Sequence, residues 1–399
     1  MKLSVACNFD PRLVDTIRNY PVYEVYGKLT SDVIGGGRPS FALPSVNRRN
    51  VAEYVDRVHA ANIEFKYLIN AACSANVEYT RTGQRRIRSL LDWLADIGVD
   101  SVTTNHPMLL KTVKEHYQFK CRVGIFASVN SPQRAKQWES EGADSICLED
   151  ISCNRDFKLL AKIRKTVNCE LQLLVNNICS HSCFMAETHK NMAVHASQRG
   201  DRNKGFYVDY CTIRCTTERI RNPVQFIRST WIRPEDLAEY EKIGFDTFKI
   251  VDRSSSTETL HSRVAAYSQR SFDGNLLNLI CSSSRKKTSL TKYLGYVRYF
   301  CRLFTIHPAK LKKLRTIGRL HAQLTDVSDS CPVQIMNKDL DGFLEPFKNT
   351  SCCEMDCSVC CHCHEVAERY VVVDEEYRAE CISLGDQLIK EMEDGALWQ

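Results

Sequence analysis

The sequence contains no apolar run of the roughly 18 residues that a membrane-spanning helix needs, so we expect no membrane span. The opening segment MKLSVACNFDPRLVD lacks the apolar core and the small-residue cleavage site of a secretory signal. We therefore expect a cytoplasmic protein. The excess of positive charge is small, +6 for 399 residues. A net charge of this size is compatible with an anionic substrate or an RNA partner but requires neither.

Several catalytic signatures are also missing. Neither H-E-x-x-H nor G-x-S-x-G occurs, no dinucleotide-type glycine pattern follows the first predicted strand, and glycines 35–37 do not lead into a phosphate-loop G-K-[ST]. Cysteine, in contrast, is abundant, with 20 residues. A disulfide scaffold is normally short and secreted, whereas clustered cysteines in a reducing compartment indicate metal binding.

Short apolar segments alternate with helical stretches along the first 280 residues. Eight such units in series predict a TIM-type (β/α)8 barrel, with an open doubly wound sheet as the alternative. The segments are nearly all apolar, as expected of strands that are covered on both faces. The predicted strands are residues 2–8, 21–27, 64–70, 100–105, 120–130, 143–150, 170–177 and 246–252.

We place the barrel at residues 1–280 and a helical, cysteine-rich extension at 281–399. Within the barrel, the connection after the seventh strand, 178–233, is far longer than an ordinary βα loop. This connection contains four cysteines and follows the carboxyl end of a strand, where barrel enzymes build their active sites. We therefore expect a metal-binding insertion at the catalytic face.

The cysteines of this insertion form two C-x3-C pairs separated by 27 residues: Cys179, Cys183, Cys211 and Cys215. Four thiolates can hold either zinc or a [4Fe–4S] cluster. Structural zinc pairs usually have the spacing C-x2-C, so the longer spacing favours iron–sulfur. The alternative is four unrelated buried thiols.

A second group has six cysteines within twelve residues, in the segment SCCEMDCSVCCHCHEVAE at 351–368. So dense a run has no apolar periodicity and cannot be a core segment. We predict a second metal centre here, either an iron–sulfur cluster or zinc, on Cys352, Cys357, Cys360 and Cys363. The competing ligands are Cys353, Cys361, His362 and His364.

Polar residues follow several predicted strands, at the end where a barrel carries its catalytic groups. The candidate catalytic residues are Asn176, Glu149, His195 and Arg38. Arg38 closes a GGGR loop that can bind a carboxylate or phosphate, and His195 lies near the thiolates. Each strand-end residue is equally suited to capping a loop or to contacting a ligand. The basic stretch 285–320 carries aromatic residues, which suits RNA contact or an amphipathic helix facing the core.

The segment from VGIFASVNSPQRAK to LLVNNICSHSC, the GGGR loop and the segment 229–260 resemble the peptidase U32 family, also called collagenase-like. The resemblance covers about residues 1–280. It implies an iron–sulfur protein, because members resembling oxygen-independent hydroxylation factors carry a [4Fe–4S] cluster around the strand-seven loop. Those members act in ubiquinone synthesis, on tRNA uridine or on ribosomal RNA cytidine, and prephenate is implicated as oxygen donor for some.

By this resemblance Cys179 matches the first family cysteine. Cys183, Cys211 and Cys215 occupy the region of the others, with different spacings. The dense tail looks like that of a radical-SAM-associated branch, for which a specialised metabolite is a plausible substrate. The implied function is an oxygen-independent hydroxylation or related redox step on an RNA base, quinone precursor or metabolite. The alternatives are a metal-dependent peptidase, or a non-catalytic iron–sulfur subunit paired with a relative or a radical-SAM enzyme.

Overall fold

The computed structural model describes residues 1–201, 205–281, 306–324, 331–352 and 354–399. The chain forms two compact units. The barrel unit comprises 1–207, 229–272 and 341–360, and the C-terminal unit comprises 208–228, 273–340 and 361–399. This division differs from a single boundary at residue 280, because part of the insertion belongs to the second unit and a tail segment belongs to the first.

Eight parallel strands close into a barrel in sequence order, with β1 hydrogen-bonded to both β2 and β8. The predicted (β/α)8 fold is therefore confirmed. The fifth strand is shorter than predicted because the chain turns into a 3-10 helix, Ile125–Ala127, directly after Gly124. The strands are β1 Lys2–Ala6, β2 Val22–Gly27, β3 Glu64–Ile69, β4 Ser101–Thr104, β5 Lys120–Val123, β6 Ser145–Cys147, β7 Glu170–Leu174 and β8 Thr247–Ile250.

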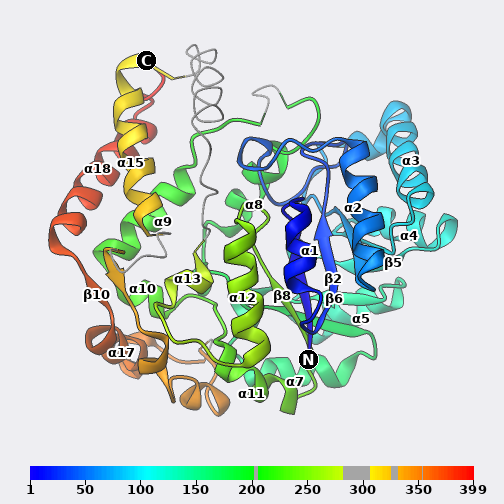
Figure 1. Ribbon diagram of the computed structural model, residues 1–399. Helices are drawn as coiled ribbons and strands as arrows, with labels where there is room; N and C mark the ends of the chain where they lie inside the picture. Colours follow the sequence, from blue (N-terminus) through cyan, green and yellow to red (C-terminus); the bar gives the residue numbers. More distant parts are fainter. Residues whose placement is uncertain (202–204, 282–305, 325–330, 353) are drawn as a thin grey trace. The chain divides into compact units, whose positions relative to one another are not determined.

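The helices between the strands lie on the outside of the barrel, as α1, α2 and α12 show in Figure 1. Most start at a side chain that caps the first turn. For example, Asp10 accepts from the amide of Arg12, and Ser256 accepts from that of Thr259. The helices of the barrel unit are α1 Pro11–Ile17, α2 Arg48–Ala60, α3 Arg81–Asp96, α4 Pro107–His116, α5 Pro132–Ser140, α6 Asp150–Cys153, α7 Phe157–Thr166, α8 Ala186–His195, α11 Leu237–Lys242, α12 Thr257–Gln269 and α16 Cys357–Cys360.

The lumen of the barrel is polar, so the expectation of nearly all-apolar strands is wrong for its inner face. Glu24 on β2 accepts hydrogen bonds from Ser4 on β1, from Lys66 on β3 and, at 2.6 Å, from Arg122 on β5. Because β2 and β5 are not neighbours, the bond to Arg122 crosses the lumen. Arg122 reaches on to Glu170 of β7 at 2.5 Å. These side chains fill the lumen with paired charges.

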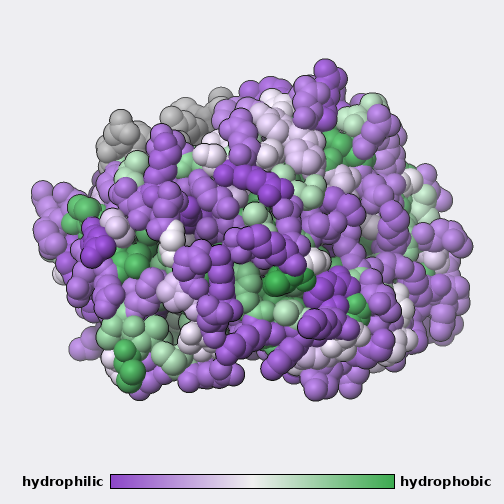
Figure 2. All heavy atoms as spheres, turned by 90° about the horizontal axis from the view of Figure 1, so that it is seen from below, coloured by the Kyte–Doolittle hydropathy of each residue, from purple (hydrophilic) through white to green (hydrophobic). Residues whose placement is uncertain are grey.

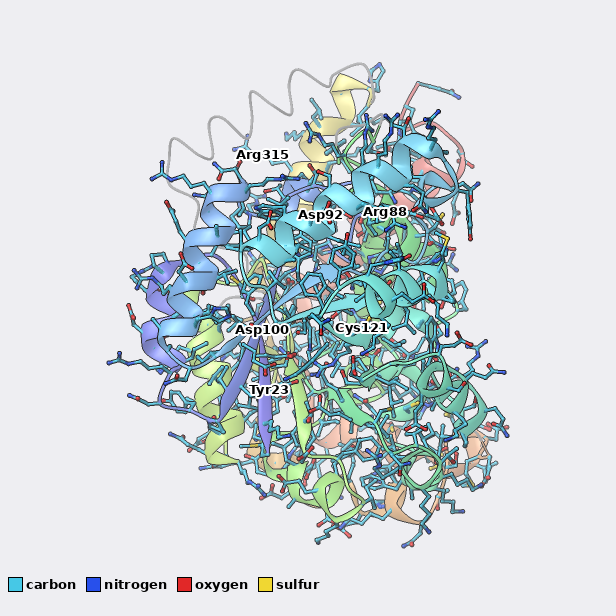
Figure 3. All side chains as sticks on the ribbon, turned by 90° about the vertical axis from the view of Figure 1, so that its right-hand side faces the viewer. Tyr23, Arg88, Asp92, Asp100, Cys121 and Arg315 are labelled. Carbon is cyan, nitrogen blue, oxygen red and sulfur yellow. The ribbon has the colours of Figure 1, made fainter. Side chains whose placement is uncertain are left out.

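Ion pairs and hydrogen bonds, rather than apolar packing, hold the side chains of this lumen network together. Burial by itself would raise the pKa of Glu24, but Arg122 and Lys66 hold it below its ordinary value. Arg122 also donates to the hydroxyl of Tyr23, 2.7 Å away, near the start of β2 (Figure 3). A buried network of this kind is stable only while every charged member keeps its partner.

The C-terminal unit is built mainly from helices. The long helix α18 packs on α9, where a Cβ on Gly385 would lie 2.1 Å from Thr217 Oγ1, so only glycine allows this approach. Ion pairs from Arg221 to Asp386 and from Lys313 to Glu391 tie α9 and α15 to α18. The elements are α9 Tyr210–Arg221, α10 Val224–Ile227, α13 Leu277–Ile280, α15 Leu311–Gln323, β9 Val333–Gln334, α17 His362–Tyr370, β10 Val372–Val373 and α18 Glu375–Glu393.

The face seen in Figure 2 is largely hydrophilic, with hydrophobic side chains in small separate groups. Among the described helices, none combines the length and the hydrophobicity that crossing a bilayer requires.

His321 on α15 gives the C-terminal unit a defined response to acid. Its enclosed Nε2 has no hydrogen-bond partner in the described chain, and burial together with nearby Arg219 lowers its pKa to about 4. Protonation therefore favours the unfolded state, where the pKa is about 6.5. The His321 contribution to stability is complete above about pH 6.5 and is lost as the pH falls towards 4, at up to about 1.4 kcal/mol per pH unit.

A His321→Gln variant should remove this part of the acid sensitivity. Urea unfolding of the variant and the parent between pH 7 and 4.5 measures it. The parent should lose more stability than the variant over this range. Equal slopes in both proteins would contradict the prediction.

Candidate functional site

The carboxyl ends of the eight strands meet at one end of the barrel, and the loop after β2 meets the insertion after β7 there. The amide of Gly36 donates to Ser197 Oγ at 2.7 Å, and this hydroxyl lies 2.9 Å from the carbonyl of Gly36. The amide of Arg199 donates to the carbonyl of Asp32 at 2.7 Å. Gly35 has φ +90°, a conformation that favours glycine, and an added Cβ would meet Ser197. The glycine run thus serves to join two loops.

Arg38, at the end of this loop, pairs with Asp252, which follows β8. The guanidinium lies 2.8 Å from Asp252 Oδ2, and the side chain of Asp252 is 2% exposed while that of Arg38 is 40% exposed. Arg38 therefore stands at the barrel mouth, as predicted, with one side towards solvent and the other on a buried carboxylate. Its role in catalysis stays a prediction.

Glu149, predicted as a catalytic residue, follows β6 and is 5% exposed. It accepts hydrogen bonds from Asn130 at 2.9 Å and from Ser152 at 2.7 Å, and Lys190 of α8 lies 3.5 Å away. Burial by itself would raise its pKa, but the hydrogen bonds and Lys190 lower it below the ordinary value. The carboxylate is thus held ionised at the mouth, which suits a cation ligand or a base rather than an acid.

The neighbouring carboxylate, Asp150, points elsewhere, as expected of an adjacent pair. It accepts from Asn177 at 2.5 Å and from Thr230 at 2.8 Å, at the two ends of the insertion. Burial raises the pKa of Asp150, against the effect of these two hydrogen bonds. Asp150 therefore fastens the base of the insertion to the barrel.

The other two predicted catalytic residues make structural contacts. The side-chain amide of Asn176 donates to the carbonyl of Val251 and accepts from its amide, which joins the ends of β7 and β8. His195 closes α8, and its Nδ1 lies 3.3 Å from Gln198 Oε1. Each of the candidates Glu149, His195 and Arg38 thus makes its hydrogen bonds or ion pairs with different residues.

The four cysteines of the insertion divide between the two units. Cys179 and Cys183 lie in the barrel unit, where the carbonyl of Cys179 accepts from the amide of Thr230 at 2.9 Å. Cys211 and Cys215 lie one turn apart on α9 of the C-terminal unit, on the same side of the helix. Taken separately, neither unit brings together three or more metal-ligating side chains among the described residues. The predicted cluster site stays a prediction.

The tail cysteines also divide. Cys352, Cys357 and Cys360 belong to the barrel unit, with the last two exposed on α16, and Cys363 belongs to the C-terminal unit on α17. Cys353 lies outside the described residues. Among the competing ligands, His364 Nε2 lies 3.0 Å from the guanidinium of Arg228. The second metal centre is therefore also a prediction.

The basic stretch considered for RNA contact falls largely outside the described residues, which omit 282–305. Its last part begins α15 of the C-terminal unit, where buried Ile317 and Leu320 form the inner side of the helix. RNA binding remains an expectation that these contacts do not address.

Lys249, a polar residue that the sequence patterns did not single out, also lies within the barrel. Lys249 is a charged residue within the predicted eighth strand, and its amine lies 4.4 Å above the ring centre of Tyr26. Burial lowers its pKa. The signal that could have found it is a lysine at the centre of an otherwise apolar segment, because such a residue must face a polar lumen.

The barrel, its mouth and the insertion coincide with the match to a known family. The model of peptidase family U32 matches residues 38–279, which include Arg38, Glu149, the insertion and Asp252. The chain belongs to the peptidase U32 family. One U32 relative, named as the uncharacterized protease MJ1657 of Methanocaldococcus jannaschii, is 33% identical over 258 residues, covering 65% of this chain and 75% of its own.

Solved structures give more distant similarities. The structure of the U32 peptidase Mk0906 is 21% identical with a TM-score of 0.47, over 63% of this chain and 93% of that one. The structure of 3-hexulose-6-phosphate synthase is 12% identical with a TM-score of 0.34, over 68% and 100%.

Proposed function

We propose that this U32 protein carries out or supports an oxygen-independent hydroxylation or a related redox modification, with a [4Fe–4S] cluster on Cys179, Cys183, Cys211 and Cys215. The observation that supports the proposal is the placing of two C-x3-C pairs within the one long βα connection of a U32 barrel. Active sites of this fold form in the loops at the same end.

The donor set fits an iron–sulfur cluster in its chemistry. Such clusters take thiolate ligands, and each pair is supplied by a short segment: the turn after β7 for the first, and successive turns of α9 for the second. When bound, the cluster would supply one-electron chemistry at the mouth of the barrel. The second proposed centre, in the tail, would be either a further cluster or zinc.

The residues of the barrel would serve binding and orientation. Arg38 has an exposed side and can take an anionic group, while Asp252 fixes its direction. Glu149 and Lys190 form a second polar pair at the mouth. We propose an oxygenated small molecule such as prephenate as the oxygen donor, and an RNA base, quinone precursor or specialised metabolite as the acceptor.

Anaerobic purification with iron, sulfide and zinc counted per chain, together with an EPR spectrum of the reduced protein, tests this proposal. We expect about four irons with equal sulfide, or about eight if the tail also holds a cluster. Zinc without sulfide would contradict the proposed redox function and favour the alternative, a metal-dependent peptidase; MJ1657 is named as a protease. Iron without turnover by the pure chain would favour a partner subunit.

A further inference from the structure

A small cavity lies beneath the mouth of the barrel, where the neighbouring strands β8, β1 and β2 end. Its volume is about 10 Å³, roughly that of one water-sized group. Two cationic side chains line it, Lys28 after β2 and Arg253 after β8. An occupant therefore meets two positive groups, and no carboxylate is among the lining residues. The remaining walls are Cys7, Phe9, Leu43, Pro44 and Val46.

Arg253 is enclosed without a close counter-ion. Its residue is 5% exposed, and it makes no ion pair or hydrogen bond with the residues that the structure describes. The adjacent carboxylate, Asp252, pairs with Arg38 at 2.8 Å and acts on Arg253 only from beyond ion-pair distance. A buried guanidinium is costly unless its charge is offset and its N–H groups find acceptors. The cavity is a place where both can be supplied.

Lys28 has a counter-ion, but one that it shares. Its amine lies 2.8 Å from Asp32, whose carboxylate also accepts from the hydroxyl of Tyr67 at 2.8 Å and from two backbone amides. Burial lowers the pKa of Lys28, and repulsion by Arg253 lowers it further. Two like charges therefore meet at this cavity, with a single shared carboxylate close by.

Local contacts fix the walls of the cavity. The hydroxyl of Thr30 donates to the carbonyl of Pro44 at 2.8 Å and accepts from the amide of Val46 at 2.7 Å, which holds the loop after β2 in place. Phe9 has φ +58°, in the left-handed region, and its ring packs on Gly27, where an added Cβ would lie 2.9 Å from Phe9 Cζ. Such strain persists only where the surrounding structure determines it. The size of the cavity is thus set by the fold.

The chemistry and the size of the cavity together define its ligand. An ammonium and a guanidinium only donate hydrogen bonds, so the ligand must accept from both, and a negative charge offsets the excess of cations. A carboxylate or a phosphate exceeds the volume of one water-sized group, whereas a chloride ion is only slightly larger than water.

We propose that the cavity lined by Lys28 and Arg253 binds a single halide ion, such as chloride. The ion accepts hydrogen bonds from the amine and the guanidinium and offsets their repulsion. The site lies within the barrel unit and needs neither iron nor a redox substrate, so it goes beyond the proposed function and does not rest on it.

Crystals of the full-length protein grown in bromide locate the ion directly. Bromide is close to chloride in size and gives an anomalous X-ray signal that identifies it against water. We expect an anomalous peak in the cavity, within hydrogen-bond reach of Lys28 Nζ and of a guanidinium nitrogen of Arg253. An ordered water in the cavity, with bromide only elsewhere on the protein, would overturn the proposal. This measurement needs no variant.

Chloride titration tests the same site in solution. The line width of the chloride NMR signal is followed at constant ionic strength, with gluconate, which is too large for the cavity, as the replacing anion. Arg253→Gln should raise the dissociation constant of chloride at least about tenfold, the effect of losing one charged hydrogen bond. Circular dichroism checks the fold of the variant. Equal chloride affinity in the parent and in folded Arg253→Gln would overturn the proposal.

The matched control is Arg164→Gln, which removes the same charge elsewhere in the barrel unit. Arg164 is half-buried, and its guanidinium donates to the carbonyls of Val167 and Cys169. This variant should bind chloride as the parent does. An equal loss of affinity in both variants would show a general effect of net charge and would also overturn the proposal.

Discussion

Replacing Glu24 by glutamine is expected to lower the free energy of unfolding by about 3–5 kcal/mol, the usual cost of breaking a buried ion pair. The variant keeps the size of the side chain but leaves Lys66 and Arg122 buried beside a neutral amide. Burial already opposes the charged form of Lys66, since it lowers the pKa of this lysine to about 7. Urea unfolding followed by far-UV circular dichroism measures the loss.

The matched control is Glu53→Gln on α2. Glu53 is also paired with an arginine, Arg49 at 2.6 Å, but its side chain is 56% exposed. Exposed pairs contribute at most about 1 kcal/mol, so this variant should unfold almost as the parent does. A loss of stability in Glu24→Gln no larger than in the control would show that the lumen network contributes little.

Replacing Cys211, a proposed ligand of the [4Fe–4S] cluster, by serine is expected to remove most of the iron and sulfide from the purified protein and to abolish the proposed redox activity. Serine has nearly the size of cysteine but is a poor ligand for iron–sulfur clusters, and Cys211 is only 2% exposed. Metal analysis and the EPR spectrum of the reduced protein give the result.

Cys381→Ser is the matched control for this variant. Cys381 is also a buried helical cysteine of the C-terminal unit, on α18, and it belongs to neither predicted metal site. Its replacement should leave the iron content unchanged. Full iron content in Cys211→Ser would remove this residue from the proposed ligand set, and equal loss in both variants would indicate general instability.

The barrel was predictable because each βα unit carries its own local signals. A short apolar segment, a capping residue such as Ser131 or Asp156, and an amphipathic helix recur along the chain, and none of these depends on distant residues. The polar lumen was not predictable in the same way. Arg122 and Glu24 are 98 residues apart, and only closure of the barrel makes them partners.

The candidate site was only partly predictable, again because some of its contacts join residues that are far apart in the sequence. The position of Arg38 at the mouth followed from the glycine loop, but its partner Asp252 lies on the last βα unit. The division of the chain at residue 280 missed the long-range packing of α9 on α18, which places residues 208–228 in the C-terminal unit. Periodicity describes each helix alone and does not indicate which distant helix covers it.

The bonds between Gly36 and Ser197 and between Asp32 and Arg199 have a consequence for access to the barrel. They fasten the loop after β2 to the insertion after β7, so neither can swing outward while the other stays in place. The side chains of the Glu24 network fill part of the lumen below this point. A movement that widens the mouth at this point would therefore have to carry both loops together or break these hydrogen bonds.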